Sequence, residues 1–176
     1  LNKKALQQRL NLEPDSGLPL IGFVGRLTHQ KGVDLIAAAI AELAALPAQF
    51  ALLGKGEARL ESALATAASR HPGRVAMATA FDEGLAHQIE AGADLFLMPS
   101  RFEPCGLNQM YSQRYGTPPI ARATGGLADT IADGETGFLF ERAETSALTA
   151  AVRRAVAAWR EPGRWREMQG AAMRRD

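Results

Sequence analysis

Short apolar runs alternate along the chain with longer stretches in which apolar residues recur every three or four positions. Six of the apolar runs are bounded by glycine, proline or polar residues, which predicts buried strands. Because these runs are apolar at consecutive rather than alternate positions, each strand is expected to be covered on both faces. The predicted strands span 20–25, 49–53, 74–78, 93–98, 119–121 and 138–140.

Helical spacing of apolar residues fills most of the remaining chain. The predicted helices span 3–10, 33–46, 57–70, 82–91, 107–115, 127–132, 146–159 and 165–173. Strands that alternate with helices in this way form a parallel sheet with helices on both faces. The sequence therefore predicts one α/β domain over residues 1–176.

Polar loops follow five of the predicted strands. In parallel sheets, ligands bind beyond the carboxyl ends of the strands, so these loops are expected to meet at one edge and form a site. They are 25–32, 54–56, 79–83, 99–106 and 122–126.

The first of these loops holds two cations, Arg26 and Lys31, next to glycines that allow a ligand to approach the backbone. Arginine binds a phosphate as a fork and lysine as a point charge, so the pair suits a phosphate or a diphosphate. Two solvated surface cations are the alternative. The loop has neither the spacing of a Walker A loop nor that of a dinucleotide-binding glycine motif.

The loop after the fourth strand carries the carboxylate that we select as catalytic or ligand-binding, Glu103. Its neighbours Phe102 and Pro104 favour partial burial, and Arg101 is a candidate ion-pair partner. The helix that follows presents unpaired backbone N–H groups at its start, which suits an anion.

Three further loops leave alternatives open. Lys55 stands between two glycines, which favours a tight turn with a surface lysine. Phe81 either packs in the core or offers its ring to a base. The glycine turn at 124–126 is either plain turn chemistry or a second loop that binds hydroxyl groups, with Thr124 as its candidate residue.

Composition narrows the classes of protein and partner. Hydrophobic residues make up 47% and charged residues 22%, which are globular values. A net charge of +1 gives no electrostatic reason to expect nucleic acid or an acidic membrane as partner. No apolar run is long enough to span a bilayer, and no signal-peptide pattern opens the chain.

A single cysteine, Cys105, excludes an internal disulfide and is typical of a reducing compartment, so we predict a cytoplasmic location. No histidine lies near Cys105 in the sequence, which disfavours a thiol nucleophile. His29, His71 and His87 have no carboxylate at the spacing of metal ligands, and we predict no metal site.

Four motifs, taken together, resemble bacterial glycogen synthases and plant starch synthases. The resemblance runs in order from about Asn2 to the end of the chain. The motifs are 25–32 (GRLTHQKG), 93–107 (ADLFLMPSRFEPCGL), 115–119 (YGTPP) and 124–130 (TGGLADT).

The resemblance implies a GT-B glycosyltransferase, in which the active site lies between two Rossmann-like lobes. This chain resembles the C-terminal lobe, a single doubly wound parallel sheet that carries most of the nucleotide-sugar site. The family transfers glucose from ADP-glucose to the non-reducing end of an α-1,4-glucan, retains the anomeric configuration and needs no metal or other cofactor. The N-terminal lobe, which binds the acceptor glucan, is expected to be absent, and the lobe alone is expected to be inactive. In a plant the location would be the plastid.

The resemblance also implies roles for the residues around the transferred group. Arg26 and Lys31 bind the diphosphate, and Glu103 contacts the glucose and faces its developing positive charge. Cys105 and Gly106 lie against the sugar.

The remaining roles concern the rest of the donor. The amides of Gly106, Leu107 and Asn108 cradle the distal phosphate, and Phe81 stacks on adenine. Tyr111 stands where many other glycosyltransferases have the glutamate that holds the ribose, which leaves open how the ribose is held.

Two other functions remain open. One is a GT-B transferase that uses UDP-glucose or another donor. The other is a non-catalytic module that binds a nucleotide sugar or a glucan. The presence of Arg26, Lys31 and Glu103 together favours an enzyme over such a module.

Overall fold

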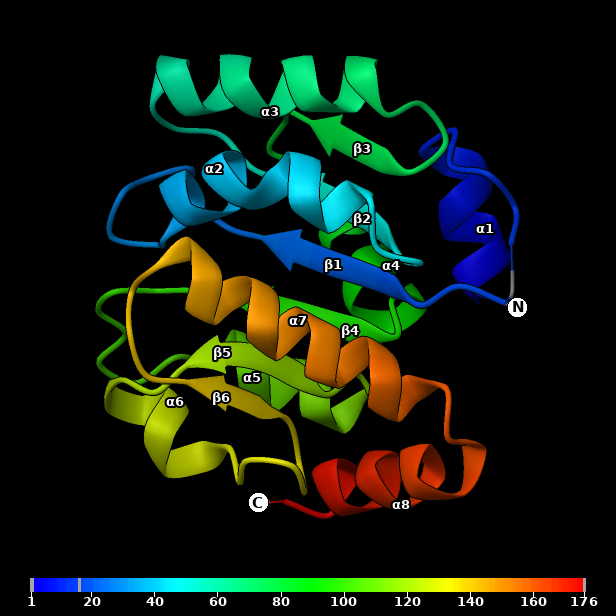
Figure 1. Ribbon diagram of the computed structural model, residues 1–176, viewed down its shortest axis with the longest axis vertical. Helices are drawn as coiled ribbons and strands as arrows, with labels where there is room; N and C mark the ends of the chain where they lie inside the picture. The colour runs from blue at the N-terminus through cyan, green and yellow to red at the C-terminus, as the bar shows by residue number, and fades with distance from the viewer. Residues whose placement is uncertain (1, 16, 176) are drawn as a thin grey trace.

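All strands of the predicted set pair in parallel in one six-stranded sheet, whose order is β3-β2-β1-β4-β5-β6 (Figure 1). The computed structural model describes residues 2–15 and 17–175. The predicted strands are confirmed, with ends that shift by at most two residues. They are β1 (Leu20–Val24), β2 (Gln49–Leu53), β3 (Val75–Ala78), β4 (Leu95–Met98), β5 (Pro119–Arg122) and β6 (Phe138–Phe140).

Helices cover both faces of this sheet, as predicted: α2 and α7 lie in front of it in Figure 1, and α4 and α5 behind it. The helices are α1 (Asn2–Arg9), α2 (Val33–Ala44), α3 (Ala58–Arg70), α4 (Glu83–Gly92), α5 (Asn108–Arg114), α6 (Gly125–Thr130), α7 (Thr145–Trp159) and α8 (Pro162–Met173). Of the predicted domain 1–176, positions 1, 16 and 176 lie outside the described residues.

Two helices begin two or three residues earlier than predicted, whereas the starts of the others differ by at most one residue. The last helix starts at Pro162 instead of Trp165, because proline fits the first helical position, where the N–H has no acceptor in the helix. The helix predicted from Leu127 starts at Gly125, so the glycine turn at 124–126 forms the first turn of α6.

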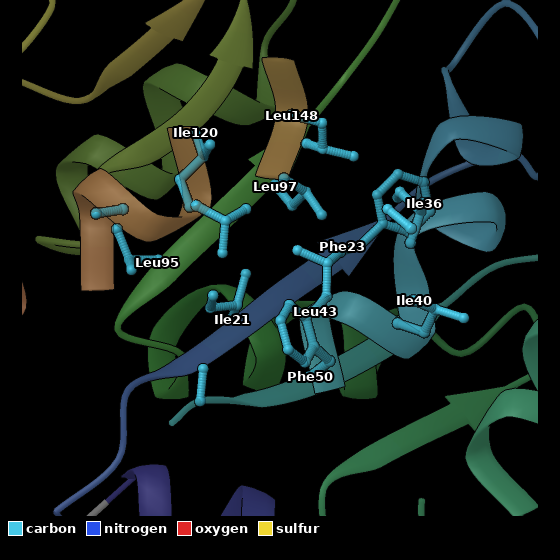
Figure 2. Packing of buried hydrophobic residues seen from close by; sticks show 14 of the residues in the cluster. Ile21, Phe23, Ile36, Ile40, Leu43, Phe50, Leu95, Leu97, Ile120 and Leu148 are labelled. Atoms are coloured by element: carbon cyan, nitrogen blue, oxygen red, sulfur yellow. The ribbon is translucent and has the colours of Figure 1, made fainter. Parts of the chain in front are cut away.

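Alternate residues of each strand point into two separate cores, which explains why the strands are apolar throughout. On one face Ile21, Phe23 and Phe50 pack against α2, as Figure 2 shows. On the other face Leu20 and Phe96 belong to the cluster that includes residues of α1 and α4.

The strand order reverses direction between β1 and β4, which is where open α/β sheets bind ligands. The loops after β1 and β4 leave the sheet at the same edge, on the left in Figure 1. The two loops that hold Lys31 and Glu103 therefore flank this crevice. Within 2–15 and 17–175, no helix is both long enough and apolar enough to cross a membrane.

Candidate functional site

The structure joins the two principal candidates across the crevice. Nζ of Lys31 lies 2.5 Å from Oε2 of Glu103, and the Ser100 hydroxyl donates to the same carboxylate oxygen at 3.2 Å. Only 12% of the Glu103 side chain is exposed. A cation from the β1 loop and an anion from the β4 loop thus meet at the reversal point of the sheet.

Arg101 does not pair with Glu103, which corrects one prediction. Its guanidinium forms two bonds with the Asp34 carboxylate, at 2.6 and 2.9 Å, and donates to the His29 carbonyl at 2.8 Å. Its backbone N–H donates to the Gln30 carbonyl at 2.8 Å. Arg101 therefore ties the β4 loop to the β1 loop, because all three of these partners lie between β1 and the first turn of α2.

Asp34 is the anchor of this connection. Partial burial opposes its ionisation, but the hydrogen bonds and charge of Arg101, together with nearby His29, outweigh burial and lower the pKa of the Asp34 carboxyl. The carboxylate is therefore charged at neutral pH and holds the guanidinium.

Glycines let the backbone of neighbouring loops touch the β4 loop. A Cβ atom on Gly32, whose φ is +71°, would lie 1.9 Å from the Pro99 carbonyl oxygen. A Cβ on Gly126 would lie 1.9 Å from the Cys105 carbonyl oxygen. The Gly126 N–H also donates to the Glu103 carbonyl at 3.1 Å. Positions 125 and 126 are therefore a packing contact of α6 and not a free glycine turn.

These contacts correct the reason for the burial of Glu103. Partial burial was predicted from its neighbours, but Phe102 is 59% exposed and Pro104 is also exposed. The glutamate is instead covered because its loop is held between the β1 loop and α6.

Arg122 is a residue of the site that the sequence interpretation missed. Its guanidinium donates to the carbonyls of Ser100, Arg101 and Glu141. The Thr124 hydroxyl also bonds to the Arg101 carbonyl, at 3.5 Å. A charged residue at the end of an otherwise apolar strand was the available signal. Two of these acceptors are backbone carbonyls of the β4 loop, so Arg122 supports that loop from the end of β5.

The start of α5 offers backbone donors, although the helix begins one residue later than predicted, at Asn108. Gly106 has a φ of +63°. The N–H groups of Gly106, Leu107 and Asn108 have no hydrogen-bond acceptor within the described part of the chain. Buried Gln109 donates to the carbonyls of Cys105 and Gly106, which orients this segment. Cys105 is exposed, and Tyr111 is about half exposed.

A cavity of about 400 Å³ opens on the same edge of the sheet, at the carboxyl ends of β1, β2 and β3. The ring of Phe81 stands at its wall and is fully exposed, so the core alternative for this residue is wrong. Arg26 is exposed and forms no ion pair within residues 2–15 and 17–175. The cavity is lined by Val24, Gly25, Arg26, Leu53, Gly54, Lys55, Ala80, Phe81, Asp82, Glu83 and Ala86.

The three histidines lie apart, as their spacing indicated. Nε2 of His29 is 4.0 Å from Asp34, and Nδ1 of His87 is 3.5 Å from Glu90. Within the described residues, no group of three or more histidine, cysteine and carboxylate side chains is arranged to hold a metal ion.

The fold and site define a class, one lobe of a GT-B glycosyltransferase. The catalytic domain of starch synthase IV from Arabidopsis thaliana, solved with ADP and acarbose, superposes with a TM-score of 0.91 at 37% identity. The match covers 99% of this chain and 38% of that chain. The family model described as "Glycosyl transferases group 1" matches residues 18–158, and the chain belongs to this family.

Bacterial relatives are similar over nearly the whole chain. The glycogen synthase of Alkalilimnicola ehrlichii is 57% identical over 98% of this chain, and that of Halorhodospira halophila is 54% identical over 98%. The chain spans 38% and 37% of the lengths of these two proteins. The resemblance to glycogen and starch synthases is therefore confirmed at the level of sequence and fold.

The contact of Gly126 with the Cys105 carbonyl predicts a large effect of one methyl group. Gly126→Ala is expected to lower the free energy of unfolding by roughly 1–3 kcal/mol, because only movement of the backbone relieves the clash. Gly163→Ala is the matched control, since Gly163 is also the second residue of a helix and has open space around it. The control is expected to be neutral or slightly stabilising, and urea unfolding of both variants measures the difference. Equal stabilities for the two variants would contradict the packing role of Gly126.

The Asp34–Arg101 pair predicts a pH-dependent contribution to stability. Because folding lowers the pKa of Asp34, its stabilisation is present above about pH 4, the ordinary value, and is lost as pH falls through the lower folded value. Asp34→Asn is expected to cost roughly 1.5–3 kcal/mol at neutral pH, and this cost should shrink below about pH 4.

Urea unfolding from neutral pH to about pH 3 tests this expectation. Asp129→Asn is the control, since Asp129 is exposed and its carboxylate forms no ion pair within the described residues. An Asp34→Asn cost that stays constant down to the lowest pH would show that the carboxylate charge is not what stabilises the loop.

Proposed function

We propose that this chain is the donor-binding half of a retaining glucosyltransferase that transfers glucose from ADP-glucose to the non-reducing end of an α-1,4-glucan. The observation that carries the proposal is the Lys31–Glu103 contact at the reversal point of the sheet, on the same sheet edge as a cavity walled by Arg26 and Phe81. The similarity to glycogen synthases, and to a starch synthase solved with ADP and acarbose, supports this choice of donor and acceptor.

The donor lies along the edge of the sheet in this proposal. Adenine occupies the cavity at the ends of β1 to β3 and stacks on the exposed ring of Phe81. The diphosphate lies between Arg26, Lys31 and the free amides at the start of α5. The glucose then reaches Glu103, with Cys105 and Gly106 beside it.

The chemistry follows from the charges at these positions. When the bond between glucose and diphosphate breaks, negative charge grows on the diphosphate and positive charge grows on the sugar ring. Fixed cations stabilise the departing diphosphate because they need no reorganisation during the reaction. The Glu103 carboxylate faces the sugar and stabilises the opposite charge.

Lys31 has a double task in this scheme. Without donor, its ammonium neutralises the partly buried Glu103 carboxylate. A bound diphosphate gives the same ammonium a second anionic partner. Binding of the donor therefore loosens the hold of Lys31 on Glu103 and leaves the carboxylate available to the sugar.

Three further parts of the proposal concern the surroundings. The acceptor glucan binds a second lobe, and the chain alone does not turn over. Arg26, Lys31 and the amides neutralise the diphosphate without a metal or another cofactor. Cytoplasmic location, or the plastid in a plant, stays a prediction, as does the lack of nucleic-acid and membrane partners.

Donor binding is tested by calorimetry on this chain. We expect ADP and ADP-glucose to bind, UDP-glucose to bind more weakly, and EDTA to leave ADP binding unchanged. Arg26→Ala should weaken ADP binding by about tenfold or more, because it removes a charge-assisted hydrogen bond. Arg166→Ala, which removes an exposed arginine of α8, is the control. Preference for UDP-glucose would favour another donor, and loss of ADP binding in EDTA would indicate a required metal.

The role of Glu103 is tested in a chimera in which this chain replaces the matching part of the A. ehrlichii glycogen synthase. We expect Glu103→Gln to lower kcat by about 10²-fold or more and to change ADP binding little, because its contact matters most in the transition state. The isolated chain should elongate no glucan. Full activity of the Glu103→Gln chimera would favour a non-catalytic binding module, and elongation by the chain alone would refute the need for a second lobe.

A further inference from the structure

The pairing between β1 and β2 continues beyond the ends of both strands. Three backbone hydrogen bonds of 2.9–3.1 Å continue the pattern: the Gly25 N–H donates to the Leu53 carbonyl, the Leu27 N–H to the Lys55 carbonyl and the Glu57 N–H to the Leu27 carbonyl. Val24 pairs with Leu53, and Leu27 pairs with Gly56 in a parallel bridge of the same register. Position 26 therefore lies directly opposite position 55.

The side chains of this extension alternate between two faces, as in a strand. Val24, Arg26, Leu53 and Lys55 all line the cavity, whereas Leu27 is buried in the core of the other face. Since neighbouring strands lie about 4.8 Å apart, Arg26 and Lys55 are cross-strand neighbours on the cavity face.

The backbone of Lys55 is held in place by its two glycines. A Cβ on Gly54 would lie 2.0 Å from the Gly25 carbonyl oxygen, and a Cβ on Gly56 would lie 2.3 Å from that of Leu27. Any other residue at either position would force the turn away from the β1 loop. The position of Lys55 beside Arg26 is therefore fixed by the fold.

Two like charges at opposed positions repel each other, which costs stability unless an anion lies between them. Neither Arg26 nor Lys55 forms an ion pair within 2–15 and 17–175. Of the carboxylates at the cavity, Asp82 is 2.6 Å from Arg9 and already paired, and Glu83 is exposed at the start of α4. The cation pair thus lacks an anion that the described chain supplies.

We propose that Lys55 and Arg26 together bind the phosphate next to the ribose of the nucleotide donor. This inference rests on the proposed function, which puts the base at Phe81 and the glucose at Glu103.

The order of strands assigns the phosphate. Along the edge from β3 to β4, the side chains follow in the order Phe81, Lys55, Arg26 with Lys31, and Glu103. A donor that spans this edge crosses Lys55 immediately after the base and ribose. Lys31, which contacts Glu103, is left for the phosphate that carries the glucose.

The test compares adenosine, AMP and ADP in NMR titrations of the chain and of Lys55→Ala. We expect the Kd of AMP and of ADP to rise by about fivefold, and that of adenosine to stay unchanged. Both effects should shrink at about 0.5 M salt, since the ammonium acts as an exposed charge. Lys4→Ala, which removes an exposed lysine of α1 away from the cavity, is the control.

Three results would overturn the inference. A weaker adenosine complex would assign Lys55 to the ribose or base, and an effect on ADP alone would assign it to the distal phosphate. Unchanged binding of all three ligands by Lys55→Ala would show that Lys55 does not contribute to nucleotide binding. If Arg26→Ala weakens ADP binding and Lys55→Ala does not, only this inference fails. If the unaltered chain binds no ADP, the proposed function fails as well.

Discussion

The loops after β1 and β4 are fastened to each other across the crevice where the sheet reverses, and the site depends on this attachment. Gly32 brings the backbone of one loop against Pro99 of the other, and Arg101 crosses from the second loop to Asp34. Both contacts join the same two loops as the bond between Lys31 and Glu103. A cation and a carboxylate from distant parts of the chain therefore hold their relative positions without a ligand between them.

Charged side chains divide into two groups at this edge. The guanidinium groups of Arg101 and Arg122 donate to an aspartate and to backbone carbonyls. They therefore stabilise the β4 loop and have few N–H groups available for a ligand. Arg26 and Lys55 face a cavity without any carboxylate partner in the described chain. The structure thus separates cations that position the loop from cations that are free to bind an anion.

The local pattern of apolar and polar residues was enough to predict much of the fold. The strands, the coverage of the sheet on both faces and the loops of the site follow from the apolar runs and their boundaries, because these are properties of neighbouring residues in the sequence. The strand order does not follow, because an apolar run carries no information about its neighbour. Arg101 pairs with Asp34 and Glu103 with Lys31, across 67 and 72 residues of sequence. These pairs could not be predicted without knowing that β1 and β4 are neighbours in the sheet. Lys55 was correctly predicted to be exposed, but its neighbour Arg26 depends on strand register.

Cys105 is the only thiol of the chain, and it is exposed two residues from Glu103. A thiol-reactive fluorophore or spin label will therefore attach at one position, at the mouth of the crevice, without any prior removal of other cysteines. Its backbone is fixed through Gln109 and Gly126, so the label reports on its surroundings from a defined origin. The chain thus carries a built-in attachment point for spectroscopy of its own ligand edge.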